Sequence, residues 1–162
     1  MDVCTLFLEN RGKPVSNFIL VPLSDSVASR AVVHYLARMS FCPEDAHITL
    51  LHIYKKPTST EDLMGKKFVS EQKSRIEAFL ENAKDKLVEG GINPRNIRIK
   101  IAEDPYPTVT DGIIDQFNKG NFDMVVIGRK RMTKAEEFVL GDISIKLVRA
   151  LEKAAILVVK SD

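Results

Sequence analysis

Apolar strand patterns and amphipathic helix patterns alternate along almost the whole chain, and this alternation is the strongest constraint on its fold. Continuous apolar runs occur at Phe18–Leu23, Ile48–Ile53 and Met124–Ile127. A strand that is apolar on both faces is typical of a parallel sheet covered by helices on each side. Right-handed crossovers between such strands produce a doubly wound sheet. The sequence therefore predicts an α/β, Rossmann-like domain.

Two further strands, expected at Ile97–Ile101 and Ala155–Val159, complete a five-stranded parallel sheet. Helical periodicity indicates a helix over Val27–Met39, a long helix that ends before Gly90, and a helix that begins after Pro107. The ligand crevice of such a fold lies beyond the carboxyl ends of its strands. The loops expected at this edge of the sheet are at Ser24, Tyr54, Asp104 and Gly128.

The composition is that of one globular domain. The chain has 162 residues, of which 44% are hydrophobic and 28% charged, enough to bury a sizeable core. Residues 1–16 do not follow the repeating plan, so we expect an N-terminal extension or an extra edge strand there. The domain itself is expected over residues 17–162.

The charge balance and the apolar runs exclude several classes of partner. The net charge is +2 and the dense basic cluster at residues 129–134 is local, so we expect no nucleic-acid partner. No apolar run approaches the roughly 20 residues that cross a bilayer, and the start of the chain lacks a signal-peptide pattern. We therefore expect no membrane partner and a cytoplasmic location.

The residues that most often carry catalysis or metal binding are scattered. Cys4 and Cys42 lie far apart, and His34, His47 and His52 form no pair at metal-ligand spacing. No nucleophile elbow and no Walker-type phosphate loop occurs. We expect no metal site and no catalytic residues, and hence a protein that is not an enzyme.

The stretch from 122 to 160 carries the most specific motif. Gly128 is followed at fixed spacing by Arg131, Gly141 and Asp142. This arrangement resembles the universal stress protein family (UspA-like domains). The nucleotide-binding members of that family have a glycine, two residues, a second glycine, nine residues, and then a glycine with serine or threonine.

Other segments resemble the same family in the same order. They are Ile19–Ser26, Thr49–Ile53, Asp123–Gly128, Leu140–Ser144 and Ile156–Val159. The resemblance covers nearly the whole chain after its first 17 residues. It implies a fold like that of the adenine nucleotide alpha hydrolases and a role in the stress response.

The resemblance also implies a candidate nucleotide or anion site. An acidic residue after the first strand would contact adenosine, and the loop from Gly128 would hold phosphates at a helix start. Here Ser24 takes the acidic position unless Asp25 reaches in, and Arg131 replaces a glycine. Asp142 replaces a hydroxyl residue, and its carboxylate would repel phosphate. The candidate residues are Pro22, Ser24, Asp25, Ile53, Gly128, Arg129, Lys130, Arg131, Gly141, Asp142, Ile143 and Ser144.

Several of these residues have structural alternatives. Asp142 is a good helix N-cap with which Arg131 could pair, and Gly128 and Gly141 could be turn glycines. The basic cluster could instead hold a different anion. Three serines follow the first strand with a spacing like the phosphate loop of flavodoxins, but serines at a helix start are more often caps; they are Ser24, Ser26 and Ser29.

The leading hypothesis is a non-catalytic regulatory or interaction module with no bound cofactor and with protein partners that are unknown. The alternative is an ATP-binding switch or slow ATPase that uses magnesium ATP at the loop from Gly128 to Ser144. The resemblance implies a homodimer through the last strand, whose apolar edge would otherwise be exposed. The expected interface residues are Ile156, Leu157, Val158 and Val159.

Overall fold

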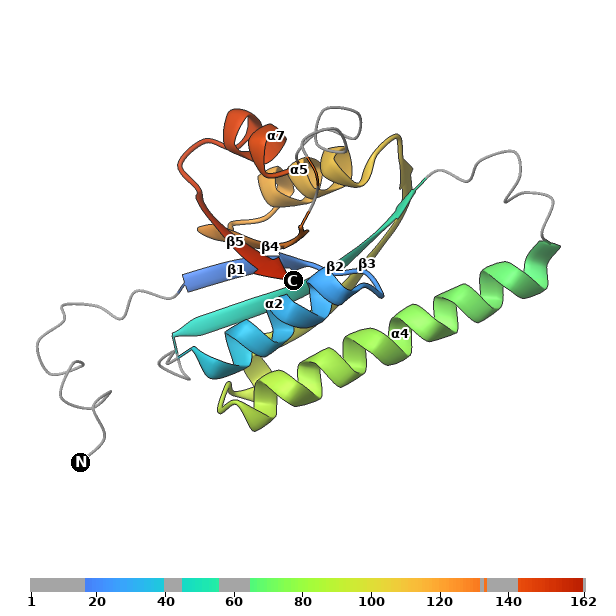
Figure 1. The fold of residues 1–162 in the computed structure, drawn as a ribbon, viewed down its shortest axis with the longest axis horizontal. Helices are drawn as coiled ribbons and strands as arrows, with labels where there is room; N and C mark the ends of the chain where they lie inside the picture. Colours follow the sequence, from blue (N-terminus) through green and yellow to red (C-terminus); the bar gives the residue numbers. More distant parts are fainter. Residues whose placement is uncertain (1–16, 40–44, 56–64, 132, 134–142, 162) are drawn as a thin grey trace, which may run out of the picture.

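The computed structural model describes residues 17–39, 45–55, 65–131, 133 and 143–161. Within these ranges five parallel strands form one sheet in the order β3-β2-β1-β4-β5 (Figure 1). The prediction of a five-stranded parallel α/β sheet is confirmed. The expected extension or edge strand at residues 1–16 lies outside the described ranges. The strands are β1 (Asn17–Pro22), β2 (Ala46–Lys55), β3 (Ile97–Tyr106), β4 (Met124–Lys130) and β5 (Ala155–Ser161).

Helices cover both faces of the sheet (Figure 1). Helices α2 (Val27–Arg38) and α4 (Gly65–Glu89) lie on one face, and α5 (Val109–Lys119) and α7 (Ile143–Ala150) lie on the other. A short 3₁₀ helix, η1 (Pro94–Asn96), precedes β3. Among the described helices, none has a stretch apolar and long enough to cross a bilayer.

Each face of the sheet has its own apolar core, because successive strand residues point to opposite faces. Val21 packs in the cluster with Leu36 of α2 and Leu80 of α4. Its neighbour Leu20 packs in the other cluster with Ile113 of α5. All five side chains are 1% exposed or less, and each such burial stabilises the fold by about 1.5–3 kcal/mol. This two-sided burial explains why consecutive residues at the centre of β1 are apolar.

Three of the four loops that the sequence predicts at the carboxyl edge belong to strands. Tyr54 lies in β2, Asp104 in β3 and Gly128 in β4, whereas Ser24 does follow the end of its strand. The predicted strand ends were therefore wrong by two to five residues at this edge. The loops that follow β2, β3 and β4 therefore begin further along the chain than the apolar runs indicate.

Backbone pairing explains these longer strands. A sheet ladder is made by main-chain groups, so polar residues such as Arg129 join it when a neighbouring strand is present. The β4–β5 pairing continues to Lys130↔Ser161. The β2–β3 pairing resumes at Lys55↔Tyr106 after a register shift.

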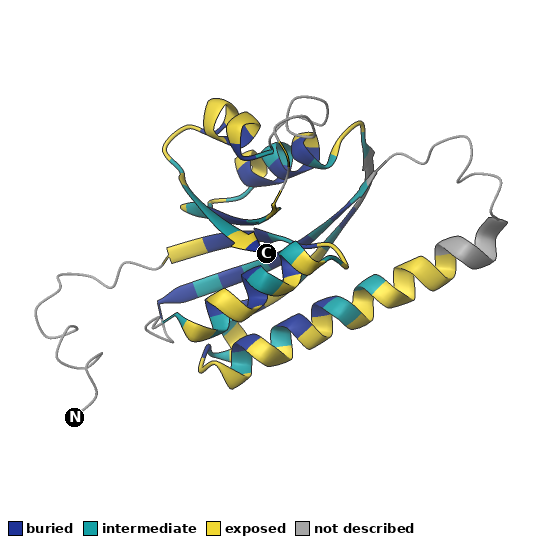
Figure 2. Ribbon diagram, in the orientation of Figure 1, coloured by how far each residue is buried: buried dark blue, intermediate teal, exposed yellow. Residues whose placement is uncertain are grey.

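Only part of helix α4 packs against the sheet. Its second half buries Leu80 and Leu87 against the sheet, whereas residues 70–75 are all exposed (Figure 2). Figure 1 shows this first half projecting beyond the sheet. The helix ends at Glu89, and Gly91 follows with φ = +94°, a conformation that favours glycine.

Candidate functional site

The candidate site lies where β1 and β4 diverge. These strands are paired at Ile19↔Met124 and Leu20↔Val125, but β1 continues to Pro22 and β4 continues to Lys130. From here β1 leads to α2 on one face and β4 leads towards α7 on the other. Such a switch point is where doubly wound sheets form their ligand crevice.

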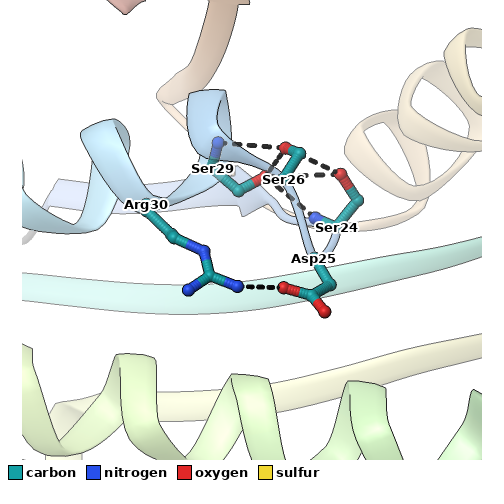
Figure 3. Close-up of polar contacts among 5 residues, drawn as sticks. All are labelled: Ser24, Asp25, Ser26, Ser29 and Arg30. Carbon is teal, nitrogen blue, oxygen red and sulfur yellow. Dashed lines mark hydrogen bonds and ion pairs between the residues drawn. The ribbon is translucent and has the colours of Figure 1, made fainter.

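Three serines in and after the β1–α2 connection hydrogen-bond to one another (Figure 3). Ser26 is the N-cap of α2 and accepts a bond from the Ser29 amide at 3.2 Å. Its hydroxyl donates to Ser29 Oγ at 3.1 Å and accepts from Ser24 Oγ at 3.1 Å, and the Ser24 amide donates to Ser29 Oγ at 2.9 Å. The interpretation as a helix cap is confirmed for Ser26, whereas Ser24 and Ser29 are partners in the hydrogen-bond network around it. A phosphate bound here would have to break this network.

Asp25 points away from the serine hydroxyls and towards α4 (Figure 3). Its carboxylate forms an ion pair with Arg30 of α2. The guanidinium of Arg30 also lies 5.6 Å from the centre of the Phe79 ring of α4. The acidic side chain that follows β1 therefore forms its ion pair within the layer made by α2 and α4.

Gly128 is a strand residue that packs against a helix. It pairs with Val159 inside β4, so its interpretation as a turn glycine was wrong. A Cβ at this position would lie 2.6 Å from the carbonyl carbon of Ala28 and closer still to the carbonyl oxygen. The first turn of α2 thus rests directly on β4, and glycine is the residue that permits this close approach.

The basic cluster divides between strand and loop. Arg129 and Lys130 belong to β4, where Arg129 pairs with Lys160 and its carbonyl accepts a bond from Ser161 Oγ at 3.4 Å. Arg131 follows the strand and is exposed. Strand pairing therefore holds Arg129 and Lys130 beside β5, and Arg131 lies past the end of β4.

The remaining candidate residues are described only in part. Gly141 and Asp142 lie outside the described residues, as does the proposed contact between Asp142 and Arg131. Ile143 is half-buried and Ser144 is buried at the start of α7. Two other candidates lie in strands: Pro22 closes β1, and Ile53, inside β2, is 5% exposed with its side chain against Gly112 of α5.

His52 lies at this edge of the sheet, although the sequence gives it no functional role. Its Nδ1 lies 2.8 Å from the carbonyl oxygen of Leu23, which can only accept, so this nitrogen carries the proton. The ring meets Tyr54 edge-on at 4.9 Å. Burial lowers the pKa of His52, and the bond to Leu23 opposes this in part. The imidazole is therefore neutral at pH 7, with Nε2 as an acceptor.

Two of the candidate side chains already have contacts within the protein itself. Asp25 is bound to Arg30, and Ile53 packs under α5 rather than at the end of its strand. Among the described residues, no three His, Cys, Asp or Glu side chains are grouped so that they could hold a metal ion. The cation of Arg131 is exposed just past the end of β4.

Comparison with known proteins gives one family and one fold. The sequence model of the universal stress protein family matches residues 17–160. A universal stress protein solved in complex with cAMP is similar to this chain, with 16% identity and a TM-score of 0.61 over 90% of this chain and 97% of that one. A family member from Arabidopsis thaliana, solved with AMP bound, has 17% identity and a TM-score of 0.62 over 90% and 92% of the two chains.

The universal stress protein UspA from Lactobacillus plantarum is also similar, with 16% identity and a TM-score of 0.62 over 91% of this chain and 99% of that one. A search of curated proteins found no match. At these identities the structural likeness establishes the fold alone. The sequence match over residues 17–160 carries the family assignment.

Proposed function

Because the chain belongs to the universal stress protein family, we propose that it is a regulatory or interaction module without catalytic activity and without ATP binding. The observation that carries this proposal is the ion pair between Asp25 and Arg30, which turns the carboxylate after β1 towards α4. The serine hydroxyls of the same connection bond to one another. The groups that would contact adenosine and phosphate are therefore already bound to other residues of the protein.

Sequence departures support the same proposal. Arg131 places a long side chain where the family's nucleotide-binding members have glycine. Asp142 places a carboxylate where they have a hydroxyl, and two unit charges of the same sign at about 4 Å repel by roughly 4 kcal/mol at an effective dielectric constant near 20. We propose a cytoplasmic location for this module.

A homodimer through β5 is part of the proposal. In the described part of the chain β5 pairs only with β4, so its outer edge has main-chain groups available for another strand. The side chains of 156–159 are apolar and half-buried. A second copy of β5 would form hydrogen bonds with the main-chain groups of this edge and would bury these side chains further.

An ATP-binding switch or slow ATPase is the second candidate. Two similar structures contain cAMP and AMP, and the point where β1 and β4 diverge is the position where this fold class binds ligands. The exposed cation of Arg131 would favour an anion there. This candidate requires Asp25 or Arg131 to change its contacts when nucleotide arrives.

Calorimetric titration of magnesium ATP into nucleotide-free protein tests the two candidates. We expect no heat of binding for the wild type. The matched variant Arg131→Gly/Asp142→Ser restores the family's pattern, and we expect it to bind ATP if these two departures caused the loss. Micromolar binding by the wild type would overturn the proposed function in favour of the switch.

The dimer is tested by size-exclusion chromatography with light scattering. We expect Val158→Lys, at the β5 edge, to be monomeric because it places a charge in the proposed interface. Val148→Lys is the matched control, since Val148 of α7 is 63% exposed, and it should remain dimeric. A dimeric Val158→Lys protein with wild-type circular dichroism would show that the interface lies elsewhere.

A further inference from the structure

A groove of about 320 Å³ lies between α2 and α4, in the helix layer to which Asp25 turns. Its α2 side is formed by the Asp25–Arg30 ion pair. Its α4 side includes Arg75, Phe79 and Lys86. Apart from Asp25, none of these residues is part of the candidate nucleotide site, so the groove is a separate surface.

The α4 wall of the groove is a single stripe of the helix. Arg75, Phe79, Asn82 and Lys86 follow one another at intervals of four, three and four residues, which places them on one face. Leu80 belongs to the neighbouring stripe, which faces the sheet. The groove face borders the core face, since Phe79 lines the groove and also packs against the cluster that contains Leu80.

The groove carries two cations that are not neutralised. Arg30 is paired with Asp25, but among the described residues neither Arg75 nor Lys86 forms an ion pair. Eleven residues separate these two cations, or about 16 Å along the helix. Cations this far apart cannot converge on one phosphate. An extended segment of about five residues, at roughly 3.3 Å each, would span them.

Between the two cations the groove is lined by Phe79 and by small apolar side chains, with the polar Asn82 beside them. The Phe79 ring is half-buried, and Arg30 holds it from the α2 side at 5.6 Å. Ala78 also lines the groove. Glu71 and Glu89 share the stripe beyond its two ends, so the basic surface extends only from Arg75 to Lys86. An acidic segment with an apolar residue at its centre matches this surface in charge and in length.

We propose that the groove between α2 and α4 binds an acidic segment of a partner protein, with carboxylates at Arg75 and Lys86 and an apolar side chain over Phe79. The inference rests on the proposed function, because it names the surface and the partner class of an interaction module. The Arg30–Asp25 pair joins the groove to the β1–α2 connection, so the same carboxylate contributes to both surfaces.

A short fluorescein-labelled peptide in which Glu and Asp alternate with Leu is the probe, and fluorescence anisotropy measures its affinity. We expect Arg75→Glu/Lys86→Glu to weaken binding by about tenfold or more, since both contacts become repulsive. The matched control is Lys84→Glu/Arg98→Glu, which changes the net charge equally but outside the groove, and it should change the affinity by less than about twofold. Circular dichroism confirms that each variant is folded.

Three outcomes would overturn the proposed binding site. They are no binding of the peptide, an equal loss of affinity in both double variants, and peptide-induced amide NMR shifts that do not include Arg30 and Asn82. Displacement by inorganic phosphate or by an oligonucleotide of equal charge would assign the surface to a small anion or to nucleic acid instead. The proposed function fails separately, since it is overturned by wild-type ATP binding whatever the peptide does.

Discussion

Replacing Gly128 by alanine tests whether α2 rests on β4 as the structure describes. The added Cβ would lie 2.6 Å from the carbonyl carbon of Ala28. The obstructing atoms belong to the backbone of the first turn of α2, so no side-chain rotation can relieve the contact. Either α2 or β4 would have to shift.

We expect a net loss of stability. Its sign tests the packing, because replacing glycine in a strand would by itself stabilise the protein. Alanine is favoured over glycine in a strand interior by roughly 0.5–1 kcal/mol. Overpacking costs about 1–3 kcal/mol, and a backbone obstruction places Gly128→Ala near the upper end of that range. The difference is a loss of about 2 kcal/mol in the free energy of unfolding.

Urea unfolding followed by circular dichroism measures this loss, because the chain has no tryptophan to report by fluorescence. With an m-value of about 2 kcal/mol/M, the midpoint should fall by about 1 M. Gly120→Ala is the matched control, since its Cβ would meet the Phe122 ring, a side chain that can rotate away. An unchanged or raised midpoint for Gly128→Ala would refute the packing of α2 on β4.

Two further predictions follow from perturbed ionisations. Burial lowers the pKa of His52, so the unfolded chain takes up this proton first as the pH falls below about 6.5, and stability should decline there. His52→Gln should lose less stability than the wild type between about pH 7.5 and pH 5.5 in urea unfolding; an equal decline would assign the effect to other groups. Lys119 and then the Tyr106 hydroxyl lower the pKa of Asp115. A carboxyl NMR titration should therefore show the Asp115 pKa raised in both Lys119→Met and Tyr106→Phe, and an unchanged pKa in both variants would contradict the described contacts.

The core of the fold could be predicted because burial on both faces leaves a direct signal in the sequence. Leu20 and Val21 point to opposite cores, and both had to be apolar. The ends of the strands left no such signal. Arg129 and Lys130 are polar, and they join β4 only because β5 lies beside them. That pairing depends on residues about 30 positions away, which local patterns do not report.

The candidate site could be predicted as a region but not as a set of contacts. Ser26 was identifiable as a cap because capping is a local interaction within one turn. The orientation of the Asp25 side chain depends on its ion pair with Arg30. Arg30 itself lies over the ring of Phe79, in a helix more than 40 residues later in the chain. His52 was likewise assigned no partner, because its bond to Leu23 crosses 29 residues. Long-range packing decides these contacts.

The unequal packing of α4 has a consequence for the folding equilibrium. Residues 70–75 bury little surface, so this stretch of the helix can open without disturbing Leu80 or Leu87, at a free energy below that of global unfolding. Amide hydrogen exchange should therefore rise in steps from the anchored end of the helix to its free end. Since Arg75 lies on the weakly held part, any ligand that contacts it would slow exchange there by binding only the closed form.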